Sequence, residues 1–242
     1  MLNPFKKSRT AESPNDDYEF KETFLLVNAS KLDSILGNET LIVCGSSRGM
    51  TSVVSFALYE LEYFIGNRLQ SKNYEDLDFQ EIFPDKQTFT KSLSERKPLL
   101  KLVRKRNADY DRWGFKLPRA SDFADDFGKV FRNPICVLCV RNPVATARSI
   151  TARNPNVRGG IGRVMMQSQK ALRAIQSLTE SSSMPSIIIN MDEAQRHPEL
   201  FLSEFSELLR LDGDLSGIAA QIEKRSYKSS APRAGITFSG PK

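Results

Sequence analysis

The chain has 242 residues, three cysteines and a formal net charge of +6, and 40% of its residues are hydrophobic. A chain of this length can bury about 70% of its unfolded surface, which excludes a small scaffold that depends on disulfides or a structural metal. No apolar run approaches the ~18 residues of a membrane span, and residues 1–17 lack the apolar core of a signal peptide. The odd number of cysteines favours reduced thiols and a cytoplasmic location, and the positive charge favours anionic ligands without selecting among them.

The N-terminal part of the chain divides into a tail and a first pair of elements. Residues 1–17 are rich in Lys, Ser, Asn, Asp and Pro, which predicts a disordered tail, and residues 18–242 are expected to form one domain. The pattern over residues 18–28 allows a strand that ends in an apolar stretch. A short helix from Ala29 is expected to end at Gly37.

The most informative stretch reads LIVCGSSRGMTSVVSFALYELEYFI and covers residues 41–65. It opens with an apolar run that is typical of a buried parallel strand. A loop of small residues follows at positions 45–49, and the apolar spacing then predicts a helix out to about Phe64. Thr51 or Ser52 is expected to cap this helix, because either side chain can accept a hydrogen bond from a backbone N–H group.

A strand, a tight turn and a helix N-terminus together form an anion site. Backbone N–H groups point at the ligand, the helix dipole adds roughly half a positive charge, and Arg48 adds a full charge within the loop. The loop is not a Walker A motif, because Gly45 and Gly49 are one residue too close and Met50 stands where that motif needs a lysine. A phosphate-like ligand is therefore predicted without Mg²⁺-dependent ATP hydrolysis. An ordinary strand-to-helix turn is the alternative.

The segments that follow are less distinctive. Residues 71–79 read as a loop that leads into a helix, and a helical stretch is predicted from Pro84 to about residue 105. Its end carries a basic cluster, which we interpret as a solvated helix face in preference to a polyanion contact. The cluster consists of Lys101, Arg104, Lys105 and Arg106.

Residues 113–119, WGFKLPR, read as a short strand that Pro118 stops. Lys116 falls near the carboxyl end of this strand, and ligands of open α/β sheets bind outside the carboxyl ends of strands. Lys116 is therefore a candidate ligand-binding residue. A further helix is expected through Phe127.

Residues 135–140 predict another buried strand, which contains Cys136 and Cys139. Residues three apart on a strand face opposite sides, so these two thiols are expected to pack in the core and not to share a metal or a disulfide.

Arg141 leaves this strand at its carboxyl end. Asn142 is expected to cap a helix that Pro143 begins, and Ser149 follows two turns along that helix. Taken alone, Arg141 is interpreted as a surface charge at the end of a strand.

The last third of the chain is expected to continue the alternation of strands and helices. A helix over residues 163–178 places Met165, Leu172 and Ile175 along one face, with the small Ser168 between them. Residues 187–189 predict a buried strand, and Pro198 opens a helix with an apolar stripe. Three apolar strands, each followed by a helix, predict an α/β fold with a mostly parallel central sheet and helices on both faces.

The loop Gly45–Ser52, GSSRGMTS, resembles the 5′-phosphosulfate loop of sulfotransferases that use 3′-phosphoadenosine-5′-phosphosulfate (PAPS). Arg141 and Ser149, eight residues apart, are similar to that family's site for the 3′-phosphate. Two shorter matches, residues 73–76 and 113–119, resemble segments of bacterial members of the family.

Two positions depart from the family pattern. Met50 stands where the family usually has glycine, and Leu117 where it usually has aspartate. The resemblance covers about residues 41–149, under half of the chain.

The resemblance implies a three-layer α/β sandwich of the P-loop-like sulfotransferase type. It also implies transfer of a sulfuryl group from PAPS to a hydroxyl or amine of an acceptor such as a carbohydrate, a lipid or a small molecule. The product of this transfer is 3′,5′-adenosine bisphosphate (PAP). No metal and no nucleic-acid partner are expected. The implied nucleotide-binding residues are Gly45, Ser46, Ser47, Arg48, Gly49, Met50, Thr51, Ser52, Arg141 and Ser149.

The resemblance also implies catalytic roles. Glu75 is predicted to be the general base, because it falls in the segment that carries the catalytic glutamate in similar bacterial enzymes. Glu60 and Glu62 are the alternative bases, and a plain surface carboxylate is the alternative for Glu75. Arg48 would stabilise the leaving oxygen, and Lys116 would contact the sulfonate or the acceptor. The single histidine, His197, lies before Pro198 at the start of a late helix, and a capping or surface role is expected for it.

Two other functions remain open at this point. A P-loop-like nucleotide kinase or NTPase would need a lysine in the loop and an acidic Mg²⁺ ligand at a strand end, where this chain has Arg141. A non-catalytic polyanion-binding protein on the same fold is the other alternative, and it would bind in a strongly salt-dependent way.

Overall fold

A six-stranded sheet forms the centre of the computed structural model, which describes residues 17–153, 160–181, 183–228 and 230–240. The strand order is β1-β2-β7-β6-β3-β5. The tail predicted for residues 1–17 lies outside the described residues except for Asp17, and the single domain from residue 18 stays a prediction. The strands are β1 Tyr18–Phe20, β2 Phe24–Val27, β3 Thr40–Gly45, β5 Trp113–Lys116, β6 Pro134–Val140 and β7 Ser186–Asn190.

The four strands β7, β6, β3 and β5 are parallel to their neighbours, as predicted, and β2 joins β7 antiparallel. All residues of β3 and β5 are buried, because helices cover both faces of the sheet. The single strand expected over residues 18–28 is instead two antiparallel strands, β1 and β2. A turn divides them, in which the Lys21 N–H group donates to the Phe24 carbonyl oxygen at 2.9 Å.

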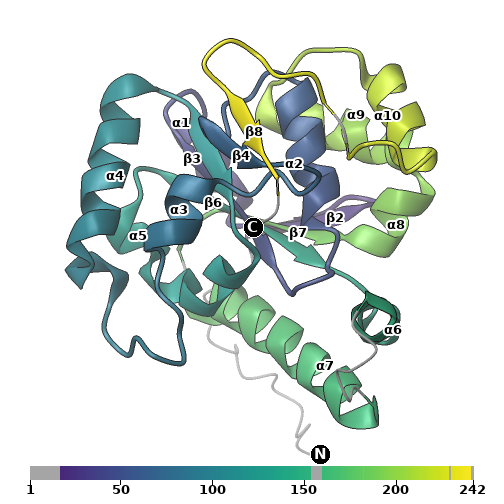
Figure 1. Cartoon of the computed structure of the whole chain (residues 1–242), viewed down its shortest axis with the longest axis horizontal. Helices are drawn as coiled ribbons and strands as arrows, with labels where there is room; N and C mark the ends of the chain where they lie inside the picture. Colours follow the sequence, from purple (N-terminus) through teal and green to yellow (C-terminus); the bar gives the residue numbers. More distant parts are fainter. Residues whose placement is uncertain (1–16, 154–159, 182, 229, 241–242) are drawn as a thin grey trace, which may run out of the picture.

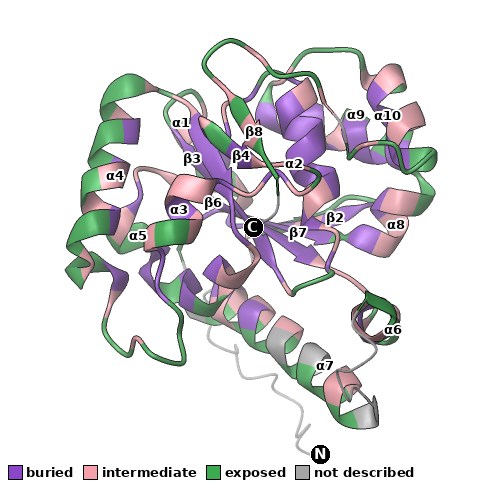
Figure 2. Ribbon diagram, in the orientation of Figure 1, coloured by how far each residue is buried: buried purple, intermediate pink, exposed green. Residues whose placement is uncertain are grey.

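Helices pack on both faces of the sheet, so the molecule is a three-layer α/β sandwich (Figure 1). One apolar core contains side chains of α2, α8, α9 and α10, and the other contains side chains of α3, α4, α5 and α7. Figure 2 shows the buried strands between helices whose outer faces are exposed. The helices are α1 Ala29–Ile35, α2 Thr51–Glu60, α3 Leu77–Ile82, α4 Lys97–Asp109, α5 Phe127–Val130, α6 Pro143–Arg153, α7 Gly160–Gln176, α8 Met191–Arg196, α9 Pro198–Leu209 and α10 Leu215–Glu223.

The cysteines lie in the cores, as predicted. Cys136 belongs to one core and Cys139 to the other, because alternate residues of β6 face opposite sides of the sheet. All three cysteines are buried and none forms a disulfide among the residues that the structure describes.

No helix among the described residues has the length and apolar character that a bilayer span requires.

The helix predicted from Pro84 begins later, at Lys97. Residues 84–96 contain only a short 3₁₀ turn, Leu93–Glu95, and Pro98 then occupies the first turn of α4, where proline is favoured. The basic cluster of α4 also differs from the prediction. Lys101, Arg104 and Lys105 are exposed, whereas Arg106 is buried, because it shares a helix face with Leu99 and Val103.

The polar C-terminal tail, for which the sequence predicted no element, ends in a strand. Strand β8, Thr237–Ser239, pairs in parallel with β4, Arg68–Gln70. Figure 1 shows this yellow segment running beside α2. The Tyr59 hydroxyl donates to the Ala231 carbonyl oxygen at 2.8 Å, and the Tyr74 hydroxyl donates to the Tyr227 carbonyl oxygen at 2.9 Å. The tail is thereby held against the helix that follows the predicted anion loop.

Candidate functional site

Gly45 ends β3 and begins the loop, in a conformation that favours glycine. Its φ is +146°, and a Cβ atom at this position would lie 2.5 Å from the Cys139 carbonyl oxygen. Cys139 is its direct partner on β6, so this contact is with the backbone of the central sheet. Glycine is therefore required for the chain to leave β3 at this point.

The loop continues as a tight turn into α2. The Gly49 N–H group donates to the Ser46 carbonyl oxygen at 2.9 Å, and both Arg48 and Met50 have positive φ values, 67° and 65°. Met50 is the N-cap of α2 and provides no side-chain cap. The prediction that Thr51 or Ser52 caps the helix is thus wrong, since both lie inside its first turn. An N-terminus without a side-chain cap is the arrangement in which an anion can accept hydrogen bonds from the first-turn N–H groups.

The second predicted motif contacts this loop directly. The Arg48 Nε donates to the Ser149 Oγ at 3.0 Å, and an Nη of Arg141 donates to the Arg48 carbonyl oxygen at 3.4 Å. This juxtaposition follows from the topology, because β6 lies beside β3 and α6 begins just after β6. Asn142 caps α6 as predicted, by accepting from the Val144 and Ala145 N–H groups at 2.9 and 3.2 Å.

Several guanidinium groups gather at this junction. Partial burial lowers the pKa of Arg48, and the nearby charges of Arg153 and Arg141 lower it further. The Nε of Arg141 is buried and has no hydrogen-bond partner among the described residues; the Asp192 Oδ1 lies 3.7 Å away. The clustering of Arg48, Arg141 and Arg153 favours the binding of an anion at this place.

Asp192 was not predicted as a site residue. It lies in the first turn of α8, which begins directly after β7, and its Oδ2 accepts from the Asn142 N–H group at 2.6 Å. Its position just beyond the end of a predicted strand could have identified it as a site residue, because the carboxyl ends of parallel strands share one edge of the sheet. Asp192 connects α8 to the turn that carries Arg141.

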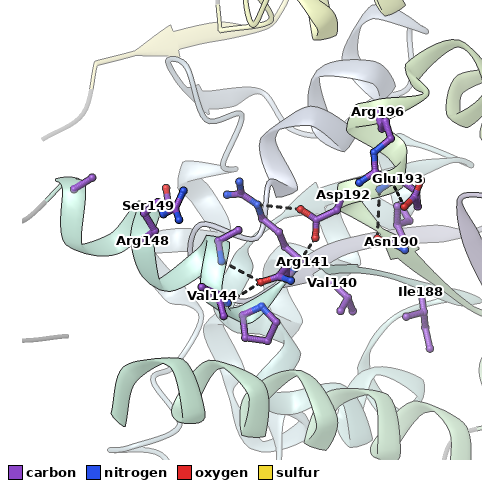
Figure 3. Close-up of a pocket in the computed structure, with 15 residues that line it drawn as sticks. Val140, Arg141, Val144, Arg148, Ser149, Ile188, Asn190, Asp192, Glu193 and Arg196 are labelled. Atoms are coloured by element: carbon purple, nitrogen blue, oxygen red, sulfur yellow. Dashed lines mark hydrogen bonds and ion pairs between the residues drawn. The ribbon is translucent and has the colours of Figure 1, made fainter. Parts of the chain in front are cut away.

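An open cavity of about 1070 Å³ lies between α6 and α8, at the carboxyl ends of β6 and β7. Figure 3 shows Arg141 and Asp192 facing each other in this cavity, with Ser149 and Arg148 on α6 beside them. The loop residues 45–52 do not line it. Gly45, Ser46 and Ser47 instead line a smaller cavity of about 60 Å³ that α7 also borders.

Lys116 and Glu75, predicted from separate segments, form an ion pair. The Lys116 Nζ donates to the Glu75 Oε1 at 2.8 Å and to the Asn73 carbonyl oxygen at 3.0 Å. Burial lowers the pKa of Lys116, and the Glu75 carboxylate partly opposes this effect. Because Lys116 is the register partner of Val43 on β3, the pair lies at the same edge of the sheet as the loop.

The segment that carries Glu75 is held in place by a buried ion pair between Arg106 and Asp76, which was not predicted from the sequence. Arg106 Nη2 lies 3.2 Å from the Asp76 Oδ2 and 3.0 Å from the Asp78 Oδ2, and Arg106 also donates to the Asn67 side chain. Asp76 caps α3, and its own N–H group donates to the Lys116 carbonyl oxygen at 3.3 Å. Burial raises the pKa of Asp76 to about 7. These contacts fix the backbone next to Glu75.

His197, expected at the surface, is exposed at the start of α9, with its Nε2 3.8 Å from the Glu193 Oε2. Arg48, Arg141 and Ser149 thus form one group, and Glu75 and Lys116 form a second group at the other side of the loop. The strand order places β3, with the loop, between β6 and β5.

Comparison with known proteins identifies the fold. No protein-family model matches the chain, and no curated protein matches it in sequence. The sulfotransferase domain of the Synechococcus PCC 7002 olefin synthase is similar in structure, with a TM-score of 0.54 and 14% identity over 78% of each chain. Mouse sulfotransferase SULT7A1 complexed with PAP is also similar, with a TM-score of 0.50 and 11% identity over 89% of this chain and 78% of that one. The chain therefore has the α/β fold of the sulfotransferases, as the resemblance of its motifs implied.

Proposed function

We propose that the protein is a sulfotransferase that moves a sulfuryl group from PAPS to a hydroxyl or amine of an acceptor. The observation that carries this proposal is the contact between Arg48 and Ser149, together with the hydrogen bond from Arg141 to the Arg48 carbonyl oxygen. It joins the two motifs that resemble the two phosphate sites of the sulfotransferases. A solved structure of the same fold is complexed with PAP, which supports a nucleotide with two separate phosphate groups as the ligand.

The donor would be held at both of its ends. The N–H groups of the loop Gly45–Ser52 and the Arg48 guanidinium would bind the 5′-phosphosulfate, where charge develops on the leaving oxygen. Arg141 and Ser149 would bind the 3′-phosphate, which ATP lacks. The Arg141 guanidinium, whose Nε lies 3.7 Å from the Asp192 Oδ1, would donate to a phosphate oxygen.

The acceptor would react at the other side of the loop, near Glu75 and Lys116. In the overall step, the bond from sulfur to the bridging phosphate oxygen breaks and a bond from sulfur to the acceptor atom forms. Glu75 would take the acceptor proton, and PAP would leave with its electron pair on the 5′-phosphate. Lys116 would hold the Glu75 carboxylate and offer a positive charge to the sulfonate oxygens.

Binding of PAP is the first test of this function. Calorimetric titration is expected to show metal-independent binding of PAP that is tighter than that of AMP or ATP. Arg48→Ala and Arg141→Ala are each expected to weaken PAP binding about 10- to 100-fold, because each removes a charge-assisted hydrogen bond. Arg210→Ala is the control, since Arg210 is exposed and pairs with Asp33 away from the loop. Equal affinity for PAP and AMP would contradict the 3′-phosphate site and with it the proposed activity.

The second test concerns the chemistry. Formation of PAP from PAPS, followed with a panel of hydroxyl and amine acceptors, is expected to slow about 10²- to 10⁴-fold in Glu75→Gln and in Lys116→Met. PAP affinity should change by less than about threefold, because the pair lies across the loop from Arg141. Glu199→Gln is the matched control, since Glu199 is an exposed carboxylate in the first turn of α9. Full activity of Glu75→Gln would mean that another group is the base.

A further inference from the structure

The outer surface of the helix pair α6 and α7 has more exposed apolar side chains than the fold requires. Figure 1 shows α7 running along the outside of the molecule with α6 near one end, and the two helices pack together. Of the seven large hydrophobic side chains that are exposed in the described part of the chain, four belong to this pair. They are Val144, Met165, Met166 and Leu172.

Helix α7 is apolar on two faces. Ala174, together with Leu178 just beyond the helix, is buried in the core under the sheet. Met165 and Leu172, seven residues apart and therefore on one face, are 57% and 65% exposed. The core explains the first face only. An apolar face that stays exposed and recurs at helical spacing is the mark of a binding surface.

The charged residues of the two helices have one sign. Residues 143–179 contain six basic residues and no aspartate or glutamate, although the whole chain has 29 acidic residues. Arg148, Arg153 and Arg173 are exposed on the two helices. The two helices therefore combine exposed apolar side chains with positive charge. The neighbouring carboxylates lie at their edges: Glu180 accepts from the Gln176 side chain at 2.9 Å, and Asp192 and Glu193 line the cavity beside Arg148.

We propose that α6 and α7 form a docking surface for bilayers that contain anionic lipids. An amphipathic helix with basic residues beside its apolar face binds at the interface of such a bilayer, where the apolar side chains enter the headgroup region and the arginines meet the lipid charges. A nucleic acid or an acidic glycan would use the arginines and leave Met165 and Leu172 in water. Methionine and leucine side chains fit the disordered boundary of a bilayer well. This binding does not depend on the proposed sulfuryl transfer.

The surface borders the large cavity. Val144 is 56% exposed and also lines that cavity, as does Arg148 (Figure 3). A bilayer docked on α6 and α7 would therefore lie at the cavity edge, next to Ser149.

Vesicle co-sedimentation with the full-length protein tests the proposal. Vesicles of phosphatidylcholine mixed with phosphatidylserine should bind the protein, and vesicles of phosphatidylcholine alone should bind it much more weakly. Met165→Ser/Leu172→Ser and Arg153→Gln/Arg173→Gln are each expected to weaken binding to the mixed vesicles about tenfold, through lost apolar insertion and lost charge respectively. Higher salt should weaken the binding of the wild-type protein.

Matched controls separate this surface from a general effect of charge or hydrophobicity. Lys101→Gln/Lys105→Gln removes two exposed cations from α4, and Leu200→Ser removes an exposed leucine from α9; neither should change binding. No binding to mixed vesicles, or an equal loss in the α4 variant, would overturn the proposal. Unchanged binding of Met165→Ser/Leu172→Ser would also overturn it, since a purely electrostatic contact would then suffice. Thermal unfolding of each variant checks its folding, with Leu172→Ser as the substitute if the double variant unfolds.

Discussion

Gly45→Ala is expected to lower the free energy of unfolding by about 2–5 kcal/mol, in spite of adding only one methyl group. The φ of +146° is unfavourable for alanine, and the new Cβ would lie 2.5 Å from the Cys139 carbonyl oxygen. That oxygen belongs to the central strand β6, which cannot move without disturbing its neighbours, so overpacking adds to the backbone strain. Chemical denaturation monitored by circular dichroism measures the difference.

Gly37→Ala separates the two causes. Gly37 also has a positive φ, +100°, but a Cβ atom there would have no atom within 4 Å. Gly37→Ala is therefore expected to lower the free energy of unfolding by about 1 kcal/mol, from backbone strain alone. Equal losses in the two variants would mean that the contact with Cys139 relaxes freely. A larger loss for Gly45→Ala should be accompanied by weaker PAP binding, because the loop would have to shift.

Arg106→Met is expected to lower the free energy of unfolding by about 3–5 kcal/mol, because it leaves the Asp76 carboxylate buried without its cation. Lys101→Met is the matched control on the same helix, where the side chain is exposed, and it should change stability by less than about 0.5 kcal/mol. The double variant Arg106→Met/Asp76→Asn should be more stable than Arg106→Met alone, since it removes the unpaired charge. A double variant no more stable than Arg106→Met would show that lost packing, and not the charge, causes the effect.

The effect should depend on pH in a defined direction. Burial raises the pKa of Asp76 from 3.8 to about 7 in the folded protein, so the folded protein favours the protonated carboxyl. The stability that this preference contributes is fully present below pH 3.8 and is lost as the pH rises through 7. Without Arg106 the carboxylate is penalised further. Denaturation of Arg106→Met should therefore show a larger loss above pH 7 than near pH 5. A loss independent of pH would contradict an ionisable Asp76 as its cause.

The main elements of the fold could be predicted from local pattern. The buried strands β3 and β6 have continuous apolar runs, and Asn142 with Pro143 marks the start of α6. Both predicted anion motifs follow such strands directly. Because parallel strands end at the same edge of a sheet, their meeting could also be expected, and the Arg48–Ser149 contact agrees with it.

The misses have identifiable physical causes. Arg106 was grouped with its basic neighbours on α4, although its helical phase places it with the buried residues Leu99 and Val103. Thr51 and Ser52 are good capping residues, but the turn closes one residue earlier, at Met50. Strand β8 has little apolar character of its own, and it forms because β4 offers an edge to pair with.

The sequence by itself determined the buried parallel strands, the loop that follows β3 and the positions of Arg48, Arg141 and Lys116 near strand ends, because these depend on short-range periodicity and on glycine and proline. Tertiary structure decided which charges are paired and which are exposed. Arg106 is buried against Asp76 and Lys116 against Glu75, whereas Arg148, Arg153 and Arg173 of α6 and α7 are exposed. The energy of a charged side chain depends on what packs around it in three dimensions, and residue type and spacing along the chain do not contain that information.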